Sequence, residues 1–325
     1  MLNQSDKFIV YLDPDTLGYL FLSFTKRRNY PVMNKLFSLL EEGFKNNYIV
    51  TPLSTDHLLS YITENKIDRS FLTMMGKLGQ LHYHQRFTVR MLQLIRVINF
   101  FFEQHYTRQI WSDAFTSDPD ERLAQGFNKY SSITATNVLQ ANEREKKLSQ
   151  VYDFINRIKN GQTVDMIASE YFKVLWEQFP DIIRPYLPSD GIPEYHMKRF
   201  FDFNEIKDIP EFHIISTILF PLFEAYGIEE IENGSRDPVL LAAETFSAYM
   251  PYSNFYVTTG DIAELIITTG VNTVYNVRVY ENNESSLYQL IEDITEAVKT
   301  KRQEREKSST KTIYQRGGSS QGFYR

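Results

Sequence analysis

The sequence predicts an α/β fold in which a parallel sheet is assembled from both ends of the chain around a large helical insertion. Two observations predict the sheet: apolar runs alternate with helical periods over the first 65 residues, and the same alternation returns after residue 235. Strands that alternate with helices along a chain are typical of parallel sheets. A third observation predicts the insertion, because almost every period between residues 65 and 203 is helical.

The N-terminal part begins with an almost wholly apolar run, Lys7 to Leu12, which suits a strand that is buried on both faces. The sequence Asp13-Pro14-Asp15 ends this strand and starts a helix, because proline is favoured at the first helical position. Ser54 can cap a later helix. The expected elements are, in order, a strand at 7–12, helices at 16–25 and 31–45, a strand at 48–53 and a helix at 55–63.

The C-terminal part starts at Asp237, which opens a helix with Pro238 directly behind it. After that helix we expect a strand at 254–258, a helix that starts near Asp261, a strand at 273–280 and a helix at 285–299. The charged tail, with Gly and Ser near its end, favours disorder. The chain thus divides into an α/β domain formed by residues 1–65 and 205–297, a helical insertion at 66–204 and a basic, disordered tail at 298–325.

Composition excludes several classes of protein. With 325 residues, of which 42% are hydrophobic, the chain can bury a sizeable core, and its net charge of −6 does not favour nonspecific binding to nucleic acid or acidic membranes. Cysteine is absent, which removes disulfides and cysteine metal ligands. We expect a cytoplasmic protein without membrane contact, because the start has no secretory signal pattern and no apolar run reaches spanning length.

Three acids mark the edge of the predicted sheet where its strands end. Asp13 and Asp261 each follow a strand, and Asp237 opens the helix that leads into the strand at 254–258. If the strands at 7–12 and 254–258 are neighbours, Asp13 and Asp261 meet at one edge, where α/β proteins form their sites. Carboxylates without sulfur or imidazole are hard oxygen ligands, which suit Mg²⁺ or Mn²⁺. Such an ion can activate water and stabilise charge at a phosphodiester.

Each acid also has a purely structural explanation. Asp13 and Asp237 both precede proline, as helix N-caps do, and Asp261 lies in a first helical turn, where any acid interacts favourably with the helix dipole. Because two of the three acids follow strand ends, we favour a shared metal site over three independent caps. The acids that we keep as supporting candidates are Asp15, Asp56 and Glu244.

At these positions the chain resembles the PIN-like nuclease superfamily. The first strand ends in an acid, IVYLD with Asp13, and a later helix opens with an acid and an Ala-rich run, RDPVLLAAETF with Asp237. The next strand ends in Thr-x-Asp, VTTGD with Thr259 and Asp261. The resemblance implies a three-layer, parallel-sheet domain and a metal-dependent endoribonuclease that hydrolyses single-stranded RNA. The three aspartates would hold Mg²⁺ or Mn²⁺, and Thr259 would orient one acid or the water.

The resemblance covers roughly residues 7–65 and 230–292, and within the first range it extends to a Ser-x-x-His pattern. Ser54 and His57 fit that pattern, but Ser60 stands where the superfamily pattern leads one to expect an acid. We expect His57 to bond to backbone rather than to act as a base.

The alternative hypothesis is a catalytically degenerate PIN-like domain that binds a protein or RNA through its helical insertion. It is favoured by Ser60, by the acidic net charge and by the size of the insertion. The basic tail is a further segment that could contact RNA or a partner. The sequence leaves the oligomeric state open.

Overall fold

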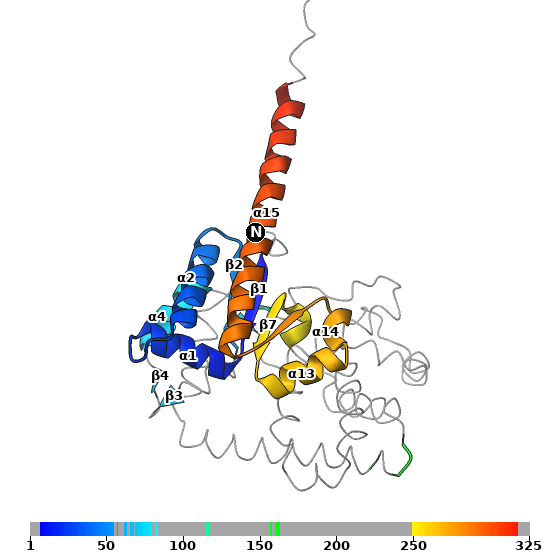
Figure 1. Ribbon diagram of the computed structural model, residues 1–325. Coiled ribbons are helices and arrows are strands. Elements are labelled where there is room, and N and C mark those ends of the chain that lie inside the picture. The colour runs from blue at the N-terminus through cyan, green and yellow to red at the C-terminus, as the bar shows by residue number, and fades with distance from the viewer. Residues whose placement is uncertain are drawn as a thin grey trace, which may run out of the picture.

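The computed structural model describes an α/β core built from both ends of the chain (Figure 1). The residues that it describes are 7–54, 57, 62–63, 66–67, 69–79, 82–83, 115–116, 157, 160–162 and 249–317. Four strands form one sheet in the order β2-β1-β7-β8. Their bounds are Phe8–Leu12 for β1, Ile49–Val50 for β2, Phe255–Thr258 for β7 and Arg278–Glu281 for β8.

All the strand pairs of this sheet are parallel, which confirms the predicted α/β class. Phe8 pairs with Ile49 across β1 and β2, and Val10 pairs with Phe255 across β1 and β7. Next to that ladder, the Oδ1 of Asn254 accepts from the N–H of Ile9 at 2.8 Å. The N-terminal strand is therefore held directly by residues near position 255, as the sequence predicts.

Helices cover one face of the sheet, where alternate strand side chains such as Val10 and Val257 point into the main core. The covering helices are α1 (Pro14–Phe24), α2 (Pro31–Lys45), α4 (Arg69–Leu78) and α15 (Glu284–Gly317). Leu36 of α2 and Leu290 of α15 are fully buried there. Each leucine of this kind stabilises the fold by about 1.5–3 kcal/mol relative to an exposed one.

The opposite face of the sheet carries a buried aromatic stack. The ring of Tyr11 lies parallel to that of Tyr256, with centroids 4.6 Å apart, and Tyr249 stacks on Tyr11 at 6.1 Å. Tyr11 and Tyr256 sit on neighbouring strands in direct register. Cross-strand pairs of this type fix the alignment of β1 and β7, which positions the residues that follow both strands.

Helix α2 approaches β2 so closely that only glycine fits at position 43. A Cβ built on Gly43 would lie 2.7 Å from the Cγ1 of Ile49, a fully buried residue. We expect Gly43→Ala to destabilise the protein by about 1–3 kcal/mol through overpacking. Gly76, exposed in α4, has no heavy atom within 4 Å of such a Cβ, so Gly76→Ala should stabilise by about 0.5–1 kcal/mol. Urea denaturation measures the free energy of unfolding of both variants. Equal effects of the two substitutions would contradict the close approach of α2 to β2.

The connection from β7 to β8 differs from the prediction. Helix α13 spans Gly260–Thr268, and α14 spans Val271–Val274, where the sequence predicts the start of a strand. Gly270 has φ +71°, a left-handed conformation that ends α13 and lets the chain start a new helical turn. Because of this, the strand predicted at 273–280 forms only at its end, as β8.

Short antiparallel strand pairs correct two further predictions. Ile62–Thr63 (β3) pairs with Lys66–Ile67 (β4), so the helix predicted at 55–63 does not extend to Thr63. His82–Tyr83 (β5) pairs with Phe115–Thr116 (β6), so the segment 66–204 is not entirely helical. The strand predicted at 48–53 is also shorter, because only Ile49–Val50 pairs. These two-residue strands are too short for a period-2 pattern to be read from the sequence.

Helix α15 continues to Gly317, so the backbone of residues 298–317 is helical, whereas the composition favoured disorder. Ion pairs one turn apart support the helix, between Arg302 and Glu306 at 3.2 Å and between Lys299 and Glu296 at 3.5 Å. Its 34 residues span about 51 Å at 1.5 Å per residue. In Figure 1 its C-terminal half projects away from the sheet.

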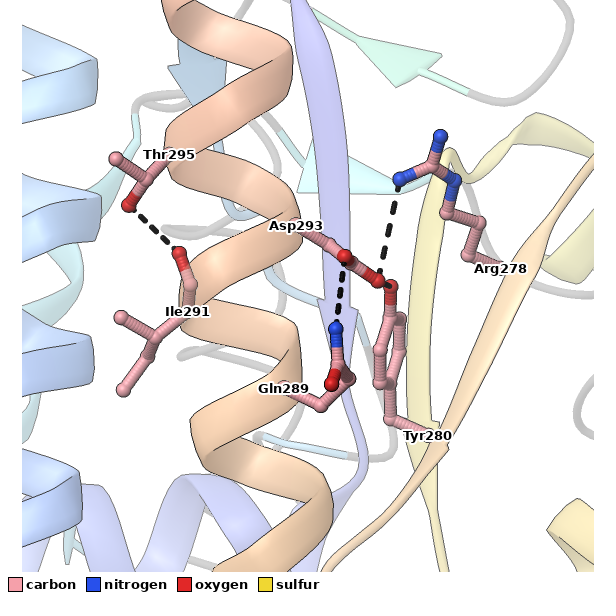
Figure 2. Close-up of polar contacts among 6 residues, drawn as sticks. All are labelled: Arg278, Tyr280, Gln289, Ile291, Asp293 and Thr295. Carbon is pink, nitrogen blue, oxygen red and sulfur yellow. Dashed lines mark hydrogen bonds and ion pairs between the residues drawn. The ribbon is translucent and has the colours of Figure 1, made fainter.

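Polar contacts hold the first half of α15 against β8 (Figure 2). Asp293 accepts a hydrogen bond from the Tyr280 hydroxyl at 2.6 Å and one from Gln289 at 3.0 Å, and it lies 3.9 Å from a guanidinium nitrogen of Arg278. Burial, with the Asp293 hydrogen bond, raises the pKa of Tyr280. The tyrosine therefore remains a neutral donor to Asp293.

In the part of the chain that the structure describes, no helix is both long and apolar enough to cross a membrane.

Candidate functional site

The carboxyl edge of the sheet brings together residues that follow three neighbouring strands. Asp13 follows β1, and its N–H donates to the carbonyl oxygen of Val257 on β7 at 3.1 Å. Asp261 lies three residues after the end of β7, in the first turn of α13, and Glu281 is the last residue of β8. The prediction that the strands before Asp13 and Asp261 are neighbours is confirmed.

Asp13 is a buried acid that also caps a helix. Its backbone is extended, with φ −64° and ψ 164°, and its Oδ1 accepts from the N–H of Thr16 at 2.7 Å. Only 7% of the residue is exposed. Burial raises the pKa of the Asp13 carboxyl to about 6 from 3.8, the hydrogen bonds from Thr16 oppose this increase, and the charge of Asp15 adds to it. The cap predicted from Asp13-Pro14 is therefore present, but burial dominates the ionisation of this acid.

The other described candidates are more open to solvent. Asp261 and Asp15 are exposed, each in the first turn of its helix. Thr259 occupies the N-cap of α13 with extended backbone, but its side chain makes no capping hydrogen bond. The Thr259 hydroxyl is thus not committed to its own helix.

Glu281 joins the carboxyl edge although the sequence reasoning did not single it out. A Cβ built on Gly260 would lie 3.5 Å from Oε2 of Glu281, so this carboxylate lies beside the start of α13. Asn283 donates to the same carboxylate, and the N–H of Glu281 donates to Ser286 Oγ at 3.0 Å. The available signal was the acid directly after the predicted strand TVYNVRVY, which is the same strand-end signal that marks Asp13.

His57 also holds the end of β1 in place. Its Nε2–H donates to the carbonyl oxygen of Leu12 at 2.6 Å, which leaves Nδ1 to accept from the N–H of Ser54 at 3.0 Å. Ser54 Oγ lies 3.1 Å from the same Nδ1 and accepts from the N–H of His57 at 3.4 Å. The expectation that His57 bonds to backbone is confirmed. This residue fixes the carbonyl directly before Asp13 and so positions that acid.

The proposed metal set is only partly within the described residues. Asp237, Asp56 and Glu244 lie outside them, as does Ser60. Among the residues that are described, no group of three or more His, Asp or Glu side chains is arranged to hold a metal ion. The structure thus brings Asp13 and Asp261 to one edge of the sheet and leaves the third predicted ligand untested.

The acids at the carboxyl edge define what the site can do chemically. All are hard oxygen donors, and Asp13 is buried, so a nearby cation would favour its ionised form.

Comparison of the chain with protein-family models, with curated proteins and with solved structures found no match in any of the three.

Proposed function

We propose that the protein is a metal-dependent endoribonuclease that hydrolyses single-stranded RNA at the carboxyl edge of a PIN-like, three-layer α/β domain. The observation that carries this proposal is the placement of Asp13 and Asp261 after the neighbouring parallel strands β1 and β7. In this proposal the segment between the two halves of the domain is an insertion. Asp13, Asp237 and Asp261 hold Mg²⁺ or Mn²⁺.

The chemistry of the donor atoms at this edge supports the choice of such an ion. The buried carboxylate of Asp13 and the more exposed carboxylates beside it, in a chain without cysteine, favour a hard divalent cation over a soft one. When bound, the ion activates water and stabilises negative charge on the phosphate. The Thr259 hydroxyl, which does not cap α13, orients the attacking water or one of the acids. Glu281 supplies a further carboxylate at the same edge.

The first experiment is cleavage of a fluorophore-labelled, single-stranded RNA in the presence of Mn²⁺. The double variant Asp13→Asn with Asp261→Asn should lose activity by a factor on the order of 10² to 10³, because several kcal/mol of transition-state stabilisation disappear. Glu264→Gln is the matched control, since Glu264 is also exposed on α13, one turn after Asp261. The control should keep activity within about twofold. Cleavage that survives the double substitution would contradict the proposal.

A second measurement separates the nuclease from a degenerate binding module without reference to activity. Mn²⁺ should raise the melting temperature of the native chain, because an ion that binds only the folded state stabilises it. The double variant should show no such increase. Ser60 favours the degenerate module, as does Asp13, whose carboxylate already accepts from Thr16. RNA binding, together with no effect of Mn²⁺ on either RNA cleavage or the melting temperature, would favour that module.

A further inference from the structure

At the amino edge of the sheet, opposite the acids, aromatic residues at strand starts are covered by cations from α15. The Nζ of Lys301 lies 4.5 Å from the ring centroid of Phe8, the first residue of β1. The guanidinium of Arg305 lies 4.6 Å from the ring centroid of Tyr48, which directly precedes β2. The two residues are neighbours, because the N–H of Phe8 donates to the carbonyl oxygen of Tyr48 at 2.7 Å.

Helix geometry explains why these two cations face the sheet. Leu287, Leu290 and Ile294 form the buried stripe of α15. Continuing that stripe by steps of three or four residues leads to Lys301 and Arg305. The apolar docking face of α15 therefore changes into a cationic one where the helix leaves the sheet.

Lys7, which directly precedes Phe8 at the start of β1, adds a third positive charge at the same edge. Burial lowers the pKa of Lys7, and the charge of Arg305 lowers it further, so the two cations lie close enough to repel each other. We call Lys7, Lys301 and Arg305 the basic edge. Residues 299–317, which include Lys301 and Arg305, contain seven Lys and Arg residues against two Glu, in a chain whose net charge is −6. An anion that binds here relieves this repulsion.

We propose that the basic edge binds the phosphate backbone of single-stranded RNA. Neighbouring cations and partly buried aromatic rings together suit a strand that offers both phosphates and bases. The rings hold the cations in place, which lowers the entropic cost of binding. The choice of RNA as the anion rests on the proposed function, whereas the concentration of positive charge does not. The five residues of β1, about 17 Å, separate this surface from the acids, so binding and cleavage can be measured independently.

The test is fluorescence anisotropy of the full chain with a labelled 20-nucleotide oligouridylate in EDTA, at several salt concentrations. Lys7→Gln with Lys301→Gln and Arg305→Gln should weaken binding at least about tenfold at 0.1 M salt. It should also reduce the slope of log K against log salt by about 2, since each phosphate contact contributes about 0.7. The matched control removes the same charge from three exposed residues directly after α1, outside α15 and the basic edge, through Lys26→Gln, Arg27→Gln and Arg28→Gln. The control should bind within about threefold of the native chain.

A charge-retaining variant tests whether positive charge, rather than the identity of each side chain, carries the binding. Lys301→Arg with Arg305→Lys keeps both charges and should bind within about threefold of the native chain. Three outcomes would each overturn the proposal. The native chain could bind with a dissociation constant above millimolar, or the Gln triple and its control could lose equal affinity. The third outcome is a charge-retaining variant that binds as weakly as the Gln triple. Polyglutamate that binds as tightly, with the same dependence on the three residues, would overturn the assignment to RNA. Salt-dependent RNA binding without Mn²⁺-dependent cleavage would remove the nuclease and leave this surface in place.

Discussion

Replacing Asp13 by asparagine should stabilise the protein at pH 8 by up to about 3 kcal/mol. The pKa of Asp13 is about 6 in the folded chain, against 3.8 for an unperturbed Asp side chain, so ionisation opposes folding. That penalty is complete above pH 6, and it disappears as the pH falls below 4. Each pKa unit corresponds to about 1.4 kcal/mol. Asparagine keeps the capping bond to the N–H of Thr16, because Asn is as good an N-cap as Asp.

The stability difference between Asp13→Asn and the native chain should therefore be largest at pH 7–8 and close to zero near pH 4. Urea denaturation at both pH values measures it. Asp15→Asn is the control: Asp15 is exposed in the same helical turn, so its removal should change stability by no more than about 0.5 kcal/mol. An Asp13→Asn variant that is less stable than the native chain at pH 8 would show that the carboxylate acts as an ordinary cap.

Replacing His57 by alanine should destabilise the protein by about 3–4 kcal/mol. The ring is fully buried and joins the carbonyl of Leu12 to the N–H of Ser54, at 2.6 and 3.0 Å. Its removal leaves both backbone groups without this partner, at about 1–3 kcal/mol each, and opens a cavity beside Tyr11, whose ring centroid lies 5.2 Å away.

The control for this prediction is Ser54→Ala, which removes the hydroxyl contact to Nδ1 at 3.1 Å but keeps both backbone hydrogen bonds of the ring. We expect it to cost only about 1 kcal/mol. Chemical denaturation of the two variants at pH 8 provides the comparison. Equal losses of stability in His57→Ala and Ser54→Ala would show that the His57 ring is not what connects β1 to the segment after β2.

The sequence was informative where elements are long and clearly bounded. The apolar run that ends at Asp13-Pro14 predicted β1 and the start of α1, and the run before Gly260 predicted β7 and α13. The neighbouring position of β1 and β7 was an inference from topology, and it is confirmed. In contrast, the β-branched Thr273 and Val274 were predicted to start a strand, but the left-handed Gly270 directs them into a helical turn.

Tertiary contacts explain the other differences. Where α15 leaves the sheet, its cations lie over the rings of Phe8 and Tyr48, partners more than 250 residues away that no local pattern reveals. At the candidate site, Asp13 and Asp261 were predicted from strand ends, and the same signal was available for Glu281, which directly follows the strand predicted at 273–280. Burial of Asp13, which sets its pKa, is likewise a property of the packed fold.

The pairing of β1 with β7 also has a consequence for biosynthesis. Ile9 and Asn254 form a hydrogen bond across 245 positions, so β1 cannot complete its ladder until most of the polypeptide has left the ribosome. At 5–20 residues per second, translation leaves this edge unpaired for roughly 12–50 s. During that time an apolar strand is exposed on the nascent chain, and the high contact order of the finished sheet makes its closure slow. Chaperone dependence during synthesis is therefore expected from the topology alone.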